Sequence, residues 1–269
     1  MKNLHLITEK YGDPCHEDGR VVLSRASSLE FHYTKRHLAP YINANTRVLE
    51  IGCATGYYAM HFADLCREYV GVDINPPHID VFNEKIATRE LKNVKAYVGD
   101  AMDLSFLDSA SFDVVLCLGP MYHLPPEERE MVYAECRRLC KHDGVVTFAY
   151  ITRIGVYAGG CVEYRDSYPT ALANENVLLR GCDDLRPDLF FFMTPEEIND
   201  HAARFGLTKI KNLATDFFFN VSAVNEMSDE KFELYKPLLD EMCANESCTG
   251  MANHALLICR KGSMPIGVI

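Results

Sequence analysis

Residues 48–56 read VLEIGCATG, an apolar run that ends in Glu50 and continues into two glycines four residues apart. A short apolar run bounded by glycine is typical of a buried strand, and the glycines permit a tight turn into a following helix. The dinucleotide pattern G-x-G-x-x-G is incomplete, because Ala54 replaces its second glycine and Tyr57 its third. The Gly-Lys-Ser/Thr of a Walker loop is also missing. The stretch therefore predicts a ligand-binding turn that is not built for phosphate.

Further apolar runs flank this turn and alternate with helical patterns, which predicts a mainly parallel sheet with helices on both faces. The expected strands cover residues 46–51, 69–73, 94–98, 112–118, 144–151, 207–218 and 254–260. The expected helices cover residues 28–38, 57–66, 126–141, 194–206 and 228–243, the fourth opened by the capping box Thr194-Pro-Glu-Glu197.

The 269 residues suit one domain with elaborations. We expect residues 1–40 to cover the sheet, residues 45–151 to form the ligand-binding core, and residues 191–269 to complete the sheet. Residues 152–190 mix Gly, Arg, Asp and Tyr without a clear period, and we interpret them as a lid-like insertion.

Composition narrows the class of partner. The formal net charge is -11 and no basic run is visible, which disfavours nucleic acids and anionic membranes as partners. The eleven cysteines lack a framework spacing, and neither a signal-peptide core nor a membrane-spanning stretch is visible. These features favour a reducing, cytoplasmic setting with free thiols. The oligomeric state is left open.

Acidic residues stand at successive strand ends. Asp73 closes the second run, where a carboxylate accepts hydrogen bonds from both hydroxyls of a ribose. Asp100 follows the third run and would accept from an exocyclic amine, while the N–H of Ala101 would reach a ring nitrogen. The fourth run ends at Gly119. Together with Glu50, these residues predict an adenosine site with carboxylates and no pyrophosphate cradle.

This set resembles the class I S-adenosylmethionine-dependent methyltransferases. EIGCATG (50–56) resembles their motif E/D-x-G-x-G-x-G with Ala54 as the departure, and Asp73, GDA (99–101) and FDVVLCL (112–118) resemble the next three motifs in order. The resemblance covers residues 45–150 and implies a doubly wound, Rossmann-like, seven-stranded α/β fold whose last strand is antiparallel. LEFHYT (29–34), LGPMYHL (118–124) and SCTGMANHALLICRK (247–261) resemble a group of small bacterial methyltransferases without an assigned substrate.

The resemblance implies S-adenosylmethionine as the cofactor. Its carboxylate would suit a helix N-terminus near Tyr57, its amine would suit Glu50, and its sulfonium would suit a tyrosine face such as that of Tyr33, although a packing role for Tyr33 is equally open. The expected cofactor-binding residues are Tyr33, Glu50, Gly52, Cys53, Ala54, Gly56, Asp73, Ile74, Asp100, Ala101, Met102 and Leu118.

Methyl transfer needs a base only when the nucleophile carries a proton at the working pH. His123, just after the fourth strand, is the candidate base because its ordinary pKa lies near neutrality, and Tyr122 would orient the substrate. The alternative is that His123 caps a helix or hydrogen-bonds a backbone carbonyl. The Asn/Asp-Pro-Pro-Tyr/Phe of nucleobase amino-methylating enzymes is absent, which disfavours DNA and RNA further.

Other charged groups have weaker functional interpretations. Arg153, Arg165 and Arg180 of the insertion would receive an acidic small molecule or would pair with local acids. The cysteines lack the paired knuckle of a zinc site, so we expect no metal. We therefore expect methyl transfer to a small molecule. The alternatives are a non-catalytic S-adenosylmethionine-binding sensor or accessory subunit, and a nicotinamide-dependent oxidoreductase, which Ala54 and Tyr57 disfavour.

Overall fold

The computed structural model describes residues 4–162, 170–182 and 189–263. Within them the chain forms a seven-stranded sheet of order β3-β2-β1-β4-β5-β7-β6. Strands β1 to β5 pair in parallel, whereas β7 is antiparallel to both β5 and β6. The strands are β1 (Arg47–Ile51), β2 (Glu68–Asp73), β3 (Val94–Val98), β4 (Phe112–Cys117), β5 (Cys140–Ile151), β6 (Leu207–Ala214) and β7 (His254–Lys261). The predicted sheet, with its antiparallel last strand, is confirmed.

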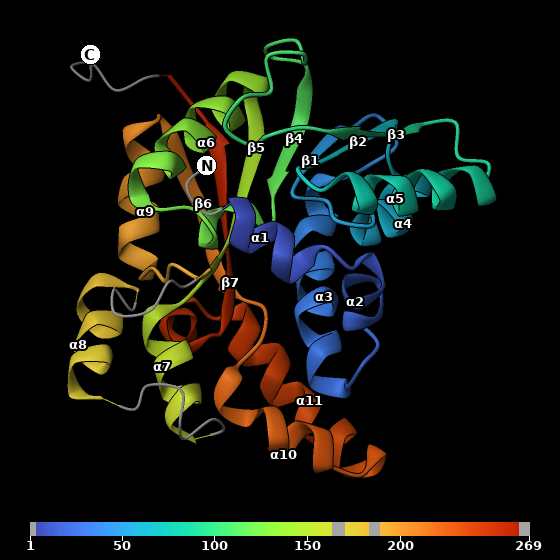
Figure 1. Ribbon diagram of the computed structural model, residues 1–269. Coiled ribbons are helices and arrows are strands. Elements are labelled where there is room, and N and C mark those ends of the chain that lie inside the picture. Colours follow the sequence, from blue (N-terminus) through green and yellow to red (C-terminus); the bar gives the residue numbers. More distant parts are fainter. Residues whose placement is uncertain (1–3, 163–169, 183–188, 264–269) are drawn as a thin grey trace.

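Helices cover both faces of this sheet (Figure 1). Phe62 of α4 and Phe82 of α5 pack with one set of alternating strand residues, whereas Val132 of α6 and Ile198 of α9 pack with the other set. The helices are α1 (Leu4–Tyr11), α2 (Pro14–Arg20), α3 (Arg25–Leu38), α4 (Tyr57–Phe62), α5 (Pro76–Thr88), α6 (Pro126–Leu139), α7 (Arg153–Val162), α8 (Ala171–Arg180), α9 (Pro195–Arg204), α10 (Val221–Glu226) and α11 (Asp229–Ala244). None of these described helices combines the length and apolarity needed to cross a bilayer.

Several element ends differ from the sequence prediction; α4, for example, ends at Phe62 and not at residue 66. Helix α6 ends at Leu139, before the predicted residue 141, and β5 begins at Cys140, before the predicted residue 144. Cys140 already pairs with Phe112, and the register then shifts to Val114–Val145, which makes the Asp143 turn a bulge within the strand. Strand β6 ends at Ala214, before the predicted residue 218, and a 3₁₀ turn follows at Phe218–Asn220.

The strand order places the site. The order reverses between β1 and β4, which are neighbours in the sheet although β2 and β3 lie between them in sequence. In open α/β sheets such a switch point leaves a crevice at the carboxyl ends of the strands. The N-terminal helices α1–α3 lie across this edge of the sheet (Figure 1).

Candidate active site

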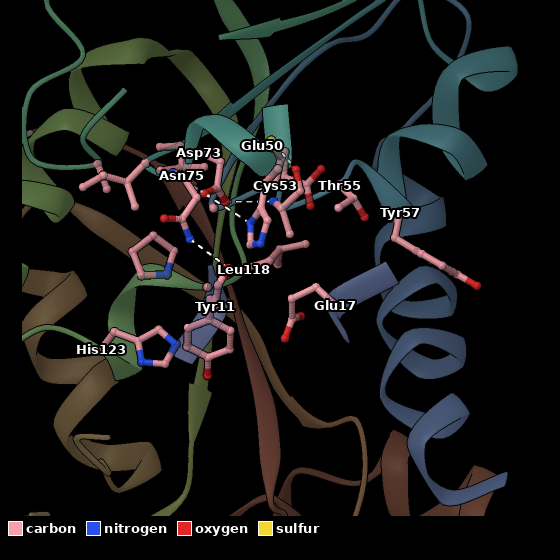
Figure 2. A pocket seen from close by; sticks show the side chains of 18 of the residues that line it. Tyr11, Glu17, Glu50, Cys53, Thr55, Tyr57, Asp73, Asn75, Leu118 and His123 are labelled. Carbon is pink, nitrogen blue, oxygen red and sulfur yellow. Dashed lines mark hydrogen bonds and ion pairs between the residues drawn. The ribbon is translucent and has the colours of Figure 1, made fainter. Parts of the chain in front are cut away.

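A cavity of about 350 Å³ lies at the carboxyl ends of β1, β2 and β4, a size that suits a small-molecule ligand. Residues from α1, α2 and α3 form its other wall. Figure 2 shows Glu50, Cys53, Asp73 and Asn75 gathered at one end, with His123 beside Tyr11 at the other. The predicted site residues that line this cavity are Glu50, Gly52, Cys53, Ala54, Asp73, Ile74, Ala101, Leu118, Tyr122 and His123.

The glycine turn approaches the fourth strand closely. Gly52 has φ +77°, and a Cβ there would lie 2.7 Å from Cδ of Pro120, so the turn requires glycine. Ala54 adopts φ +44°, so it takes the left-handed conformation that glycine adopts more readily. The N–H groups of Gly52 and Cys53 both donate to the Val72 carbonyl, at 2.8 and 3.1 Å. The turn is therefore fixed against the end of β2.

Asp73 joins this turn to the next one. Its Oδ2 accepts the Ala54 N–H at 2.8 Å, and its Oδ1 accepts the Asn75 N–H at 2.9 Å. Each carboxylate oxygen has a further lone pair, so both remain able to accept from a ligand. His78, which is buried, places Nδ1 3.7 Å from Oδ1. Asp73 thus shapes the turn and also lines the cavity.

Glu50 is a buried acid without a cationic partner. Its side chain is 1% exposed, and Tyr69 donates its hydroxyl to Oε2 at 2.7 Å. Burial raises the pKa of Glu50 to about 8; the Tyr69 hydrogen bond opposes this rise and the charge of Asp73 adds to it. Among the described residues, none forms an ion pair with Glu50. The site therefore favours a ligand that brings a positive charge to this carboxyl.

This environment gives a prediction for the free protein. The pKa of Glu50 is raised by folding, so its contribution to stability is present below the unfolded value and is lost as pH rises toward 8. At pH 8.5 the free energy of unfolding of Glu50→Gln should therefore exceed that of the wild type by roughly 2 kcal/mol, and the difference should be smaller at pH 5. Urea titrations at both pH values, with exposed Glu84→Gln as the control, measure this. If the stability of Glu50→Gln depended on pH as that of the wild type does, the raised pKa of Glu50 would be contradicted.

His123 reaches the cavity from the turn after β4. Its Nδ1 lies 2.9 Å from the Leu189 carbonyl, which can only accept, so the proton sits on Nδ1. None of the described residues hydrogen-bonds Nε2, whose lone pair is free to accept. Burial lowers the pKa of His123 to about 4. The prediction that His123 has a pKa near neutrality is therefore wrong. His123 both bonds a carbonyl and lines the site.

Tyr122 packs beside this histidine. It belongs to the 3₁₀ turn Pro120–Tyr122, and its ring centroid lies 4.6 Å from that of His123. Its hydroxyl donates to the Leu118 carbonyl at 3.3 Å. Phe190, at the end of the insertion, adds a third ring 5.2 Å from His123. The acceptor end of the cavity is therefore aromatic.

The N-terminal helices contribute residues that the sequence analysis did not place in the site. Short α1 and α2 gave no clear apolar period, yet Thr55 donates to Asp18 at 2.8 Å and Asn75 donates to the Tyr11 carbonyl at 3.4 Å. Lys85 pairs with Asp18 as well. The residues of the cover that line the cavity are Ile7, Lys10, Tyr11, Glu17, Arg20, Val21, Glu30 and Phe31.

Four predicted cofactor residues do not line the cavity. Tyr33 is a correction: it is 1% exposed within the core and donates its hydroxyl to Asp240 at 3.0 Å. Gly56 has φ +80° with the Phe82 ring beneath it, so its role is to turn the chain into α4. Asp100 accepts the Met102 N–H at 2.9 Å and closes a turn, which leaves Ala101 as the member of this set that lines the site.

The arginines expected to receive an acidic substrate either do not line the cavity or lie outside the described residues. Arg153 is buried and donates to both carboxylate oxygens of Glu197, each at 2.7 Å. Its function is therefore to fix α7 against α9. Arg165 lies outside the described residues. Arg180, the last residue of α8, is exposed and does not line the cavity.

Comparisons with known proteins agree with this geometry. A family model of a methyltransferase domain matches residues 48–144. The uncharacterized methyltransferase YcgJ of Bacillus subtilis is 31% identical over 101 residues, 38% of this chain and 39% of that protein. A ubiquinone biosynthesis O-methyltransferase of Neisseria meningitidis is 29% identical over 108 residues, 40% and 44% of the two chains. The chain spans less than half the length of the curated relatives it matches first.

Solved structures extend the similarity over most of the fold. The crystal structure of YcgJ superposes with a TM-score of 0.54 at 20% identity, and covers 87% of this chain and 99% of that one. A SAM-dependent methyltransferase from Methanosarcina mazei gives a TM-score of 0.56 at 16% identity, with 84% and 97% covered. At these identities the superpositions show a shared fold.

Proposed function

We propose that the chain is a class I S-adenosylmethionine-dependent methyltransferase that transfers the methyl group of this cofactor to a small-molecule acceptor. The observation that carries the proposal is the pairing of Glu50 and Asp73 at one end of a single cavity. Glu50 is a buried acid without a cation, and Asp73 is a carboxylate with lone pairs to spare. An amino-acid nucleoside with a cationic amine and a ribose satisfies both.

The described residues fit the cofactor. Glu50 would hold the amine, Asp73 would accept from the ribose hydroxyls, and Ala101 and Leu118 would give the adenine an apolar slot. When bound, S-adenosylmethionine supplies an electrophilic methyl group on a sulfonium. The protein's task is then to hold a nucleophile in line with that methyl group and to exclude water.

His123 is placed to prepare the nucleophile. With its proton held on Nδ1 by Leu189, Nε2 accepts a hydrogen bond from a hydroxyl, thiol or amine in the cavity. The low pKa keeps the imidazole neutral throughout the physiological range, so Nε2 stays available as an acceptor. Tyr122, Tyr11 and Phe190 pack around His123 and would restrict the acceptor's orientation.

Three features support a small molecule as the acceptor. The N-terminal helices cover the cavity, so a folded polymer would have to displace them to reach His123. The net charge of -11 opposes nucleic acids. Two relatives carry names of small-molecule methyltransferases, the ubiquinone biosynthesis enzyme and a sterol 4-C-methyltransferase of Caenorhabditis elegans.

The free thiols of the ten cysteines described support a cytoplasmic setting.

Turnover tests the proposal. Purified protein with S-adenosylmethionine and a panel of small hydroxyl, thiol and amine compounds should form S-adenosylhomocysteine above the acceptor-free rate. The matched control is the same panel with Asp73→Ala. A protein that binds the cofactor, measured calorimetrically, and turns over no member of the panel would favour the sensor alternative.

A further inference from the structure

A second histidine packs beside Tyr122. His254 opens β7, lines the cavity, and places its ring centroid 6.2 Å from that of Tyr122. It comes from the antiparallel end of the sheet, more than a hundred residues after His123 in sequence. Two imidazoles thus reach one cavity from different strands, and the function proposed above uses only one of them.

One carboxylate fixes the orientation of His254. Oδ2 of Asp216 lies 2.9 Å from Nδ1 of the ring, and Oδ1 accepts the backbone N–H of His254 at 2.6 Å. The carbonyl of His254 accepts from the N–H and hydroxyl of Thr215, at 2.9 and 3.0 Å. Since Nδ1 is committed to Asp216, Nε2 is the ring nitrogen left for a ligand, and none of the described residues hydrogen-bonds it.

The charges around His254 keep it protonated. Burial lowers its pKa, but the charges of Asp216 and Glu30 raise it to about 9 overall. Glu30 lies 3.9 Å from Nδ1 and itself accepts from Arg20 at 2.7 Å. Burial raises the pKa of Glu30, but the charges of Arg20 and His254 bring it to about 2. At neutral pH the cavity therefore faces a protonated imidazole.

Cationic side chains line the cavity together with aromatic rings. The cations are Lys10, Arg20 and His254. Arg20 pairs with Glu30 and His254 with Asp216, whereas Lys10 lies over the Phe190 ring, 4.4 Å from its centroid. Aromatic rings, among them Phe31, Tyr58 and Phe190, form the remaining wall. The combination suits an apolar or aromatic molecule that carries one anionic group.

We propose that His254, oriented by Asp216, is a specificity residue that binds a carboxylate of the acceptor through Nε2–H, so that the substrate is a small carboxylic acid with an apolar body. This inference rests on the proposed function, because it assigns the acceptor of the same cavity. The acid-binding role once expected of Arg153 falls instead to a histidine from the last strand.

Matched acid and amide probes test the inference in protein saturated with S-adenosylhomocysteine. Benzoate and phenylacetate are titrated calorimetrically at pH 7 against benzamide and phenylacetamide. At least one acid should bind about tenfold or more tightly than its amide, the effect of one charge-assisted hydrogen bond. The preference should weaken as pH rises through 9, where His254 loses its proton while Arg20 stays charged.

Variants test whether the preference for acids over amides comes from His254 or from the overall charge of the protein. His254→Gln should abolish the preference and leave the affinity for S-adenosylhomocysteine unchanged, and Asp216→Asn should reduce the preference. The matched control is His142→Gln, which removes an exposed histidine 2.9 Å from Asp143 and outside the cavity. Equal binding of acids and amides, binding of neither, or a preference that survives in His254→Gln would overturn the inference. Failure of S-adenosylhomocysteine to bind the wild type would instead overturn the proposed function, and this inference with it.

Discussion

Asp73→Ala is expected to weaken S-adenosylmethionine binding about a hundredfold or more. Without the carboxylate, the complex would lose charge-assisted hydrogen bonds from two ribose hydroxyls, each of roughly 1.5–3 kcal/mol. The substitution also releases the N–H groups of Ala54 and Asn75, which Asp73 now accepts at 2.8 and 2.9 Å. Isothermal titration with S-adenosylmethionine measures the affinity, and urea unfolding measures the separate cost to stability.

Two variants separate the ligand effect from the effect on the turn. Asp73→Asn keeps the size and one carbonyl oxygen, so its affinity should fall between those of the wild type and the alanine variant. Asp64→Ala removes an exposed carboxylate that pairs with Arg89 at 3.0 Å outside the cavity, and should bind as the wild type does. Wild-type affinity in Asp73→Ala would refute the placement of the ribose at the end of β2.

His123→Ala is expected to lower turnover about a hundredfold while cofactor affinity stays within a few-fold. General-base assistance is typically worth 10²–10⁴-fold, and His123 lies at the acceptor end of the cavity, away from Asp73 and Glu50. Single-turnover formation of S-adenosylhomocysteine measures the rate. His61→Ala, in the exposed part of α4, is the matched control. Unchanged turnover would remove His123 as the base and leave positioning alone as the source of catalysis.

The pH dependence of the wild-type enzyme adds a second test of the same residue. Because burial lowers the pKa of His123 to about 4, Nε2 remains unprotonated as pH falls through 6.5. Turnover should therefore lose the His123 contribution only as pH approaches about 4, and His123→Ala should lack this step. A step near 6.5 that His123→Ala abolishes would mean that the imidazole is solvated in the working enzyme.

The sheet could be predicted because its central strands are continuous apolar runs, and those that border the site end in a glycine or an acid. The run of β1, for instance, ends at Glu50 and Gly52, and the run of β2 ends at Asp73. Parallel strands bring their carboxyl ends to one edge, so residues far apart in sequence could be placed together without a structure. Ten of the fourteen predicted site residues line the same cavity for this reason.

The cover and the acceptor end could not be predicted in the same way. Helix α7 has the sequence RIGVYAGGCV, and its three glycines interrupt the helical pattern of apolar residues. Helices α1 and α2 are only 8 and 7 residues long, too short to show a clear period. Tyr33 lies on α3, part of which faces the cavity, but the face on which each side chain points depends on packing against α11 and cannot be read from spacing. The role of His254 could not be predicted because Asp216, which orients its ring, lies 38 positions away in sequence.

A thermal-shift titration of the wild type with S-adenosylmethionine, S-adenosylhomocysteine and NADH in parallel tests the cofactor assignment of the cavity most directly. A ligand that binds only the folded state raises the midpoint of unfolding. Both adenosyl compounds should raise the midpoint in a saturable way, and NADH should not, since the turn at Gly52 lacks a pyrophosphate cradle. A midpoint that neither adenosyl compound changes would contradict the assignment of the cavity and of every residue placed in it.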